Sequence, residues 1–381
     1  MAQENLINYR SSQIPEFFIR DATEQDDSRL LELISETMPS NGMILSYERK
    51  PSYFAATRTQ YTNPIIKLVC LVSDPDYIVA MINIGTKKCF INQQRTEMSY
   101  VADLRLDANY RGKRTVHFIM EYVYNTHPRD LFYQSVVLEG NLIARHLLHK
   151  PRENFPQPFP YDDVTTYMIS KIKKPKSNRK ISIKILEPSL ITDVNKFIES
   201  MSQHYNFLPD YDFNELKQGN HPYWLGMKME DFKLIYSDQN QLVGLFGLWN
   251  QKQFKQTKVK KYSKGLKLVK PFYNFVAKRT GQILLPPEEG HFNYLMIHSA
   301  LCDPQHKDAF EQILYQAHLA TKAKKYESFC ITLAANDPRI QQMSKVKSHI
   351  IRAKHAIHSF ESKPEGYFDR SKISYFEVGR I

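Results

Sequence analysis

The sequence predicts a mixed α/β protein of two tandem halves, because one order of strands and helices occurs twice along its 381 residues. Each half contains a hairpin pattern, LVSDPDYIVAMINIG in the first and LIYSDQNQLVGLFGLW in the second, with apolar runs around a polar turn. Each half then has a strand that leads into a helical pattern, at residues 100–106 and 116–124 and again at residues 294–301 and 310–323. The repetition is one of topology rather than of sequence.

The first half alternates short apolar strands with helical patterns. A helix is expected after Thr23, whose hydroxyl can cap its first turn, with an apolar face of leucine and isoleucine that stops at Pro39. A second helical pattern, EGNLIARHLLHK, follows the strand at residues 131–138. The strands expected in this half are residues 17–20, 65–73, 77–85, 98–106, 131–138 and 165–171.

A linker rich in Lys, Pro and Ser, residues 173–180, separates the expected domains at residues 1–172 and 181–381. After this linker the plan starts again with a strand at 181–186 and a helix at 188–204. Strands at 232–237, 241–249, 294–301 and 329–333 continue it. The second half also carries an extra basic segment near residues 251–289, between its third and fourth strands.

Composition excludes several classes of protein. The polar N-terminus is not a secretory signal, and no run of eighteen apolar residues predicts a membrane span, so we expect a cytoplasmic protein. Its four cysteines are widely spaced, which suits neither a zinc site nor a disulfide framework, and no metal is expected. A formal net charge of +12 is compatible with a nucleic-acid surface, a membrane-surface patch or a polyanionic cofactor.

The segment YVADLRLDANYRGKRTV, residues 100–116, joins a strand to a basic turn at which a helix begins. The first N–H groups of a helix have no partner within it, and the helix dipole adds positive potential there. A strand, a basic turn and a helix start in this order therefore predict a site for phosphate groups.

DLRLDANYRGK resembles motif A of the GNAT N-acyltransferase superfamily, with Asp103 at its start and Tyr-Arg-Gly-Lys at its end. The resemblance implies two tandem GNAT-like domains, each with a mixed, mostly antiparallel central sheet flanked by helices, and acetyl-CoA as co-substrate. It also implies that loop amides hold the pyrophosphate of coenzyme A while basic side chains screen its charge. The residues that it assigns to the cofactor are Leu104, Leu106, Tyr110, Arg111, Gly112, Lys113, Arg114, Thr115 and, from the run below, Asn141.

The chain departs from the family pattern at three positions. Arg114 and Val116 stand where the family has glycine, and glycine or alanine, which allow close approach of the phosphates. The run EGNLIARHLLHK resembles motif B and supplies Asn141, but Leu148 replaces the tyrosine that commonly protonates the departing thiolate. Either His146 or His149 substitutes, or water does so, or the site does not turn over.

For the general base the family most often uses a carboxylate on the fourth strand, because an ammonium acceptor must lose a proton before it attacks the thioester. Asp103 matches that position, and Glu97 lies further back on the same strand. Alternation would put Glu97, Asp103 and Arg105 on one face and Tyr100 on the other. An Asp103–Arg105 contact would instead make Asp103 a member of a structural ion pair.

The second half departs further from the family pattern. Its strand HFNYLMIHSAL runs into CDPQHKDAFEQ, which has no glycine and carries Asp303 and Asp308 around the would-be phosphate loop. Negative charge there opposes pyrophosphate binding, so we expect a degenerate copy without a cofactor site. It would supply a substrate wall or act as a structural partner.

The leading hypothesis is transfer of an acyl group, most simply acetyl, from coenzyme A to an amine by direct attack. The acceptor, a small molecule or a peptide, is not indicated. One alternative is a catalytically weak acyl-CoA sensor or scaffold. Another is nucleic-acid binding through residues 252–270, where lysines lie among aromatic residues, although this is a less favoured partner. The same segment could instead contact an anionic membrane or form a lid over the first half.

Overall fold

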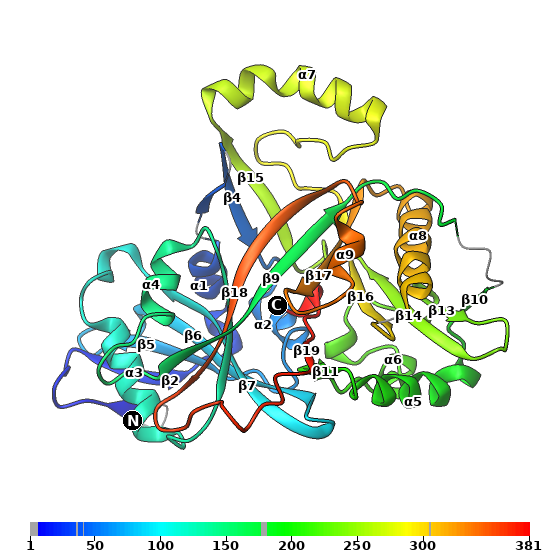
Figure 1. Cartoon of the computed structure of the whole chain (residues 1–381). Helices are drawn as coiled ribbons and strands as arrows, with labels where there is room; N and C mark the ends of the chain where they lie inside the picture. Colours follow the sequence, from blue (N-terminus) through cyan, green and yellow to red (C-terminus); the bar gives the residue numbers. More distant parts are fainter. Residues whose placement is uncertain (1–6, 36, 41, 177–180, 305) are drawn as a thin grey trace.

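One sheet runs through both halves of the protein in the computed structural model, which describes residues 7–35, 37–40, 42–176, 181–304 and 306–381. Within these residues the sheet has fourteen strands in the order β1-β2-β5-β6-β7-β8-β18-β9-β17-β16-β14-β13-β10, with β12 paired to β6 (Figure 1). Most neighbours are antiparallel, and the parallel pairs β7–β8 and β16–β17 lie at matching places in the two halves. The mixed α/β class predicted from the sequence is confirmed.

The first half supplies nine strands and four helices to the described structure. Its strands are β1 (Ile7–Arg10), β2 (Phe17–Asp21), β3 (Thr37–Ser40), β4 (Met43–Glu48), β5 (Ile66–Leu71), β6 (Ile78–Ile91), β7 (Gln94–Leu106), β8 (Tyr133–Leu138) and β9 (Gln157–Ile169). Its helices are α1 (Asp27–Ile34), α2 (Tyr53–Arg58), α3 (Thr115–Thr126) and α4 (Leu142–Leu148). The helix expected to reach Pro39 ends at Ile34, and β3 follows it.

The second half supplies the remaining described elements. Its strands are β10 (Ser182–Ile185), β11 (Tyr205–Asn206), β12 (Leu208–Pro209), β13 (Phe232–Tyr236), β14 (Leu242–Trp249), β15 (Gln256–Tyr262), β16 (Tyr294–Cys302), β17 (Ser328–Ala334), β18 (Ser348–Ser359) and β19 (Ile373–Ser374). Its helices are α5 (Ile191–Met201), α6 (Phe213–Lys217), α7 (Lys264–Thr280), α8 (Lys307–Ala323) and α9 (Ile340–Met343).

The last long strands of the two halves cross over at the centre of the sheet. β9 of the first half pairs with β17 of the second, while β18 of the second half pairs with β8 of the first and along its whole length with β9 (Figure 1). Backbone hydrogen bonds therefore join the halves directly. Residues 173–176 of the expected linker have no regular structure, and its residues 177–180 lie outside the described part of the chain.

The basic segment of the second half also crosses to the first half. Its strand β15 pairs with β4, which pairs with β3, and this three-stranded sheet carries α7 away from the main sheet (Figure 1). We call this three-stranded sheet together with α7 the arm. A small apolar cluster of Leu45, Val259 and Tyr262 stabilises it.

Helices cover both faces of the first half of the sheet. Phe118 and Ile119 of α3 pack on one face against Ile82, while Leu30 and Leu33 of α1 pack on the other. In the second half, α8 buries one face and α5 the other. This packing fixes the strand ends and the helix starts that form the site described next.

Candidate functional site

Strand β7 contains a bulge at the position that the sequence singles out. Asp103 and Leu104 of β7 both lie opposite Ile82 of β6, so one strand has an extra residue. Asp103 takes up the excess with a positive φ of 55°. A bulge bends its strand and turns backbone groups out of the ladder. The bulge therefore aims part of the β7 backbone away from β6.

The parallel neighbour of β7 pairs with it only briefly. β7 and β8 are joined at Ser99 and Tyr100, where Tyr100 lies opposite Gln134, and the pairing of the described residues ends there. From residue 101 to the end of β7 every residue is half-buried. The bulged part of β7 thus has one edge that β8 does not cover.

The turn after β7 is braced from the neighbouring elements. The Asp107 carboxylate accepts hydrogen bonds from the N–H of Asn109, at 2.8 Å, and from the hydroxyl of Tyr77, at 3.1 Å, and pairs with Arg29 of α1. Burial would raise the pKa of the Asp107 carboxyl, but these donors together hold it below its usual value. The turn that leads to α3 is therefore held in one conformation.

The apolar residues assigned to the cofactor line the end of β7. Leu104 and Leu106 are half-buried against the core under α3. Tyr110 closes the strand end by packing edge-on against Phe17, with ring centroids 6.2 Å apart. The ammonium of Lys113 lies over the Tyr110 ring, 4.6 Å from its centroid.

The basic turn connects directly to the start of α3. Arg111 is extended, and Gly112 follows with a φ of 78° and open space where a Cβ would stand. Arg114 occupies the N-cap in the left-handed region, at a φ of 57°, and its Nη1 donates to the carbonyl of Gln13 at 3.2 Å. Thr115 is buried as the first residue of the helix. Arg114 thus adopts the conformation for which the family pattern has glycine, and its side chain is directed to the β1–β2 connection.

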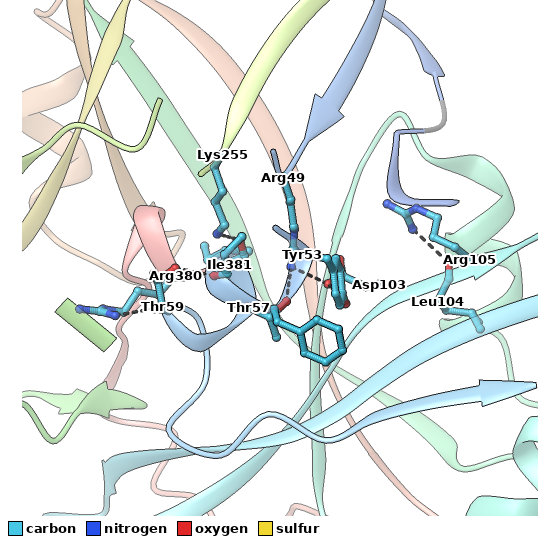
Figure 2. A network of polar contacts seen from close by, with 12 residues as sticks. Arg49, Tyr53, Thr57, Thr59, Asp103, Leu104, Arg105, Lys255, Arg380 and Ile381 are labelled. Atoms are coloured by element: carbon cyan, nitrogen blue, oxygen red, sulfur yellow. Dashed lines mark hydrogen bonds and ion pairs between the residues drawn. The ribbon is translucent and has the colours of Figure 1, made fainter. Parts of the chain in front are cut away.

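Asp103 is anchored by two residues from the segment before and within α2. Arg49 donates from Nη2 to Oδ1 at 3.0 Å and its Nη1 lies 2.8 Å from Oδ2, while the Tyr53 hydroxyl donates to Oδ2 at 2.9 Å (Figure 2). Arg49 keeps its orientation through a further bond to Thr57. The expected alternative partner, Arg105, donates to the Leu104 carbonyl instead (Figure 2). The ion pair of Asp103 is therefore made with Arg49, from another part of the chain.

The other two residues expected to act in catalysis lie elsewhere. Glu97 is exposed across from Lys88 and accepts a bond from Thr86 at 3.3 Å. His149 ends α4, with Nε2 3.5 Å from the Ser135 hydroxyl, and burial lowers its pKa. None of the contacts described for Glu97 or His149 reaches Asp103. Asn141, which the resemblance assigns to the cofactor, caps α4 by accepting the N–H of Ala144 at 3.1 Å.

Two half-buried lysines border Asp103. Lys87 of β6 places its ammonium 3.3 Å from the centroid of the Tyr100 ring and donates to the carbonyl of Arg380 at 2.8 Å. Burial, together with the charge of Arg380, lowers the pKa of Lys87 to about 7. Lys255 of the second half donates to the carbonyls of Gly379 and Ile381, and burial lowers its pKa as well (Figure 2).

Arg380 connects these groups to the second half. Its guanidinium is almost fully buried, lies 3.5 Å from the centroid of the Tyr223 ring, and donates to the carbonyl of Tyr223 at 2.7 Å. It also donates to the carbonyl of Thr59 at the end of α2 (Figure 2) and to Nε2 of His298 at 3.1 Å. The segment that contains Arg380 therefore contacts both halves and lies close to Asp103.

The second half repeats the bulge, and β17 likewise pairs with β16 only up to Met296, but side chains fill the edge there. Ser299 and Ala300 of β16 both lie opposite Phe246, and Ser299 has a φ of 49°. Here the backbone groups at the bulge are taken by side chains: the Ser299 N–H donates to Oε2 of Glu377 at 2.7 Å, and the Ala300 carbonyl accepts from Arg339 at 2.8 Å. Among the described residues, no side chain accepts a hydrogen bond from the matching N–H of Asp103.

Glu377 fills the second copy as a buried carboxyl group. Oε2 also accepts from the hydroxyls of Tyr211 and Tyr375, at 3.0 and 3.1 Å. Burial raises the pKa of Glu377 to about 7, although these donors oppose the shift. The backbone N–H at the bulge of the second half is thus occupied by a buried side chain of the same half.

Sequence reasoning missed Arg49, Lys87, Lys255, Arg380 and Glu377. Arg49 and Lys255 belong to loops whose partners are distant in sequence, and Lys87 lies beyond Gly85, where the expected strand stops. No local pattern marks any of them. Their role becomes visible only when the two halves are brought together.

Comparisons with known proteins point to one fold. No protein-family model and no curated protein matches the sequence. Among solved structures, Saccharomyces cerevisiae N-myristoyltransferase with bound myristoyl-CoA is similar, with a TM-score of 0.56 and 10% identity over 95% of this chain and 83% of that one. A second structure of that enzyme gives a TM-score of 0.58 and 9% identity, covering 95% and 87%. A GCN5-related glucosamine N-acetyltransferase region of a fungal β-N-acetylglucosaminidase gives 0.59 and 10%, covering 92% and 39%.

Proposed function

Because the chain has the GNAT superfamily fold, we propose that it is an acyl-CoA-dependent N-acyltransferase whose cofactor site lies in the first half. The observation that carries the proposal is the bulge of β7 at Asp103, on a strand whose edge is uncovered and whose end leads through a basic turn to α3. The second half has the same bulge with its donor occupied by Glu377. We therefore propose a single cofactor site among the described residues, in the first half.

The pyrophosphate of coenzyme A would lie at the start of α3. The N–H groups of Thr115, Val116 and His117 have no acceptor within the helix, since its first bond runs from Phe118 to the carbonyl of Arg114. Lys113 and the helix dipole add positive potential there. The pantetheine arm would run along the uncovered edge of β7 as an added strand.

The thioester would then lie beside the bulge. A backbone N–H directed away from β6 can stabilise the oxyanion that forms when an amine attacks the thioester carbon. The new C–N bond replaces the C–S bond, the amine loses a proton, and coenzyme A leaves as a thiolate that takes one up. These steps need orientation and a proton acceptor, and they form no covalent enzyme intermediate.

We take Lys87 in preference to Asp103 as the proton acceptor. Asp103 already accepts from both Arg49 nitrogens and from Tyr53, which suits a positioning role for the bulge. Lys87 lies on the same side of the sheet as Tyr100, and its lowered pKa of about 7 leaves much of it neutral at physiological pH.

Acetyl transfer stays our first expectation for the acyl group. The similarity to a protein solved with myristoyl-CoA makes a long acyl chain the second candidate. The acceptor is proposed to be an amine, of a small molecule or a peptide.

Thermal-shift measurements with coenzyme A, acetyl-CoA and myristoyl-CoA test the cofactor claim. We expect a shift with at least one of them that is strongly reduced in Arg111→Ala/Lys113→Ala. The matched control, Lys196→Ala/Lys217→Ala, removes the same charge from exposed positions of the second half and should keep the shift. Absence of a shift with all three compounds contradicts the proposal. A shift without thiol release across a broad amine panel favours the acyl-CoA sensor instead.

A further inference from the structure

Helix α7 is attached to the protein by a small part of its surface. Ala277 is its buried residue, Leu266 packs on the apolar cluster of the arm, and the Asn274 amide exchanges two 2.9 Å bonds with the backbone of Leu285. The helix is capped at both ends, by the Ser263 hydroxyl and by Gly281 in the left-handed region. It is therefore a well-defined helix that the body of the protein leaves largely uncovered (Figure 1).

The face of α7 that points away from the protein is apolar. Leu268 is 82% exposed, Phe272 73% and Phe275 56%, and Val269 and Val276 are exposed beside them. Their spacing of i, i+1, i+4, i+7 and i+8, counted from Leu268, places them on one side of the helix. A helix at the surface of a protein normally turns its apolar face toward the core. This reversed arrangement marks a surface that a partner covers.

The charges of α7 are all positive. The helix contains no acidic residue and five cationic ones, which are Lys264, Lys267, Lys270, Lys278 and Arg279. Among the described residues, Lys267 alone of these pairs with a carboxylate, that of Glu288 at 3.0 Å. Arg279 lies over the Phe275 ring, 3.5 Å from its centroid, so its charge stays at the border of the apolar face. Long cationic side chains can reach outward from such a border while their stems stay apolar.

We propose that α7 docks in the plane of an anionic lipid bilayer, with Leu268, Phe272 and Phe275 inserted and the lysines at the headgroups. An apolar face bordered by cations is the pattern of helices that lie at a membrane interface. Charge complementarity favours anionic lipid. The proposed contact is peripheral; among the described residues, no helix has the length and apolar character needed to cross a bilayer.

A nucleic acid fits this helix less well. A polyanion would face the cations, yet the side chains that project furthest are a leucine and phenylalanines at the centre of the exposed face. The position of α7 at the end of the β3–β4–β15 arm also lets it lie flat on a surface without involving the main sheet (Figure 1).

Co-sedimentation of the full chain with vesicles tests the proposal. We expect binding to phosphatidylcholine vesicles that contain phosphatidylserine, weak binding to phosphatidylcholine alone, and loss of binding at high salt. Leu268→Gln/Phe272→Gln/Phe275→Gln should lower the partition coefficient at least tenfold. The matched control Leu142→Gln/Ile143→Gln removes apolar residues that are 69% and 81% exposed elsewhere and should bind as the wild type does.

A second measurement does not depend on removing the apolar face. Phe272→Trp places an indole at the exposed position, whereas both native tryptophans, Trp224 and Trp249, are buried. Brominated lipid should quench the new emission on vesicle addition. Wild-type protein that stays in solution with phosphatidylserine vesicles overturns the proposal, as does equal binding by the triple variant. If the protein binds an oligonucleotide in a gel-shift assay but does not bind vesicles, the proposal is overturned in favour of a nucleic-acid partner.

Discussion

Asp103 and Ser299 occupy matching positions in two bulged strand pairs, β6–β7 and β14–β16. Each is the first bulge residue, each has a positive φ, 55° and 49°, and each is followed by a residue that shares its cross-strand partner. The two sites differ in what meets the backbone. The Ser299 N–H donates a hydrogen bond to Glu377. At the other bulge, the Asp103 carboxylate forms an ion pair with Arg49. The two halves thus differ at matching bulges, because side chains fill the one in the second half.

The Asp103–Arg49 pair should matter for stability. Their side chains are 7% and 10% exposed, so Arg49→Met leaves a carboxylate with little solvent and one donor, Tyr53. Removing one member of a buried pair costs about 3–5 kcal/mol, and urea unfolding should show a loss of this order. Arg49→Met/Asp103→Asn should cost less than the sum of the single changes. Additive losses would mean that the two groups do not interact.

Gly85 allows Tyr61 to lie against β6. A Cβ at residue 85 would stand 2.5 Å from Cδ1 of Tyr61 and 2.7 Å from the carbonyl of Asn63. Overpacking of this kind costs about 1–3 kcal/mol, so Gly85→Ala should lower the thermal midpoint. Gly265→Ala is the control, because a Cβ there meets nothing within 4 Å. It should be neutral or slightly stabilising, and equal losses in both variants would contradict this account.

Glu377 should make stability fall as pH rises. Its pKa is raised from 4.5 to about 7, so between these values the folded protein keeps a proton that the unfolded chain has lost. The unfolded state binds fewer protons in this window, and the free energy of unfolding decreases by about 3 kcal/mol at most. Unfolding of Glu377→Gln from pH 5 to pH 8 should show a growing advantage over the wild type. The exposed control Glu230→Gln should show a constant difference, and a constant difference for Glu377→Gln would disprove the assignment.

Lys87 should set the pH dependence of acyl transfer. Burial and the charge of Arg380 lower its pKa to about 7, so kcat/KM should rise up to about pH 7 and then level off. An acceptor that is neutral over the whole range separates this effect from titration of the substrate. Lys87→Met should reduce kcat by roughly 10²-fold or more and flatten the profile. The exposed neighbour provides a control, Lys88→Met, which should keep both; an unchanged profile in Lys87→Met would remove the role.

The element order of both halves could be predicted from the sequence because each element is encoded locally. The residues expected at 116–124 and 310–323 lie in α3 and α8. The hairpin strands β5, β13 and β14 end within two residues of their predicted ends, whereas β6 continues six residues beyond Gly85. The GNAT fold inferred from DLRLDANYRGK and EGNLIARHLLHK is confirmed.

Features that depend on distant partners could not be predicted. The alternation of β7 continues through the bulge, so nothing in YVADLRLD indicates that Asp103 turns toward Arg49 and away from Arg105. The sequence does not indicate that β9 pairs with β18 of the other half, because the candidate partner strands have similar compositions. It also gives no prediction of β18 itself. The lysine-rich stretch at 252–270 is predicted only as a charged segment. Its strand β15 could not be predicted, because its partner β4 lies more than two hundred residues earlier in the chain.

Hydrogen–deuterium exchange of the full chain with and without coenzyme A tests the single-site claim most directly. Bound cofactor should slow exchange at the amides from Leu104 through the first turn of α3. It should leave the amides near Ser299 and the start of α8 unchanged, because Glu377 already occupies that bulge. Protection confined to the second half, or no protection anywhere at saturating coenzyme A, would contradict the account.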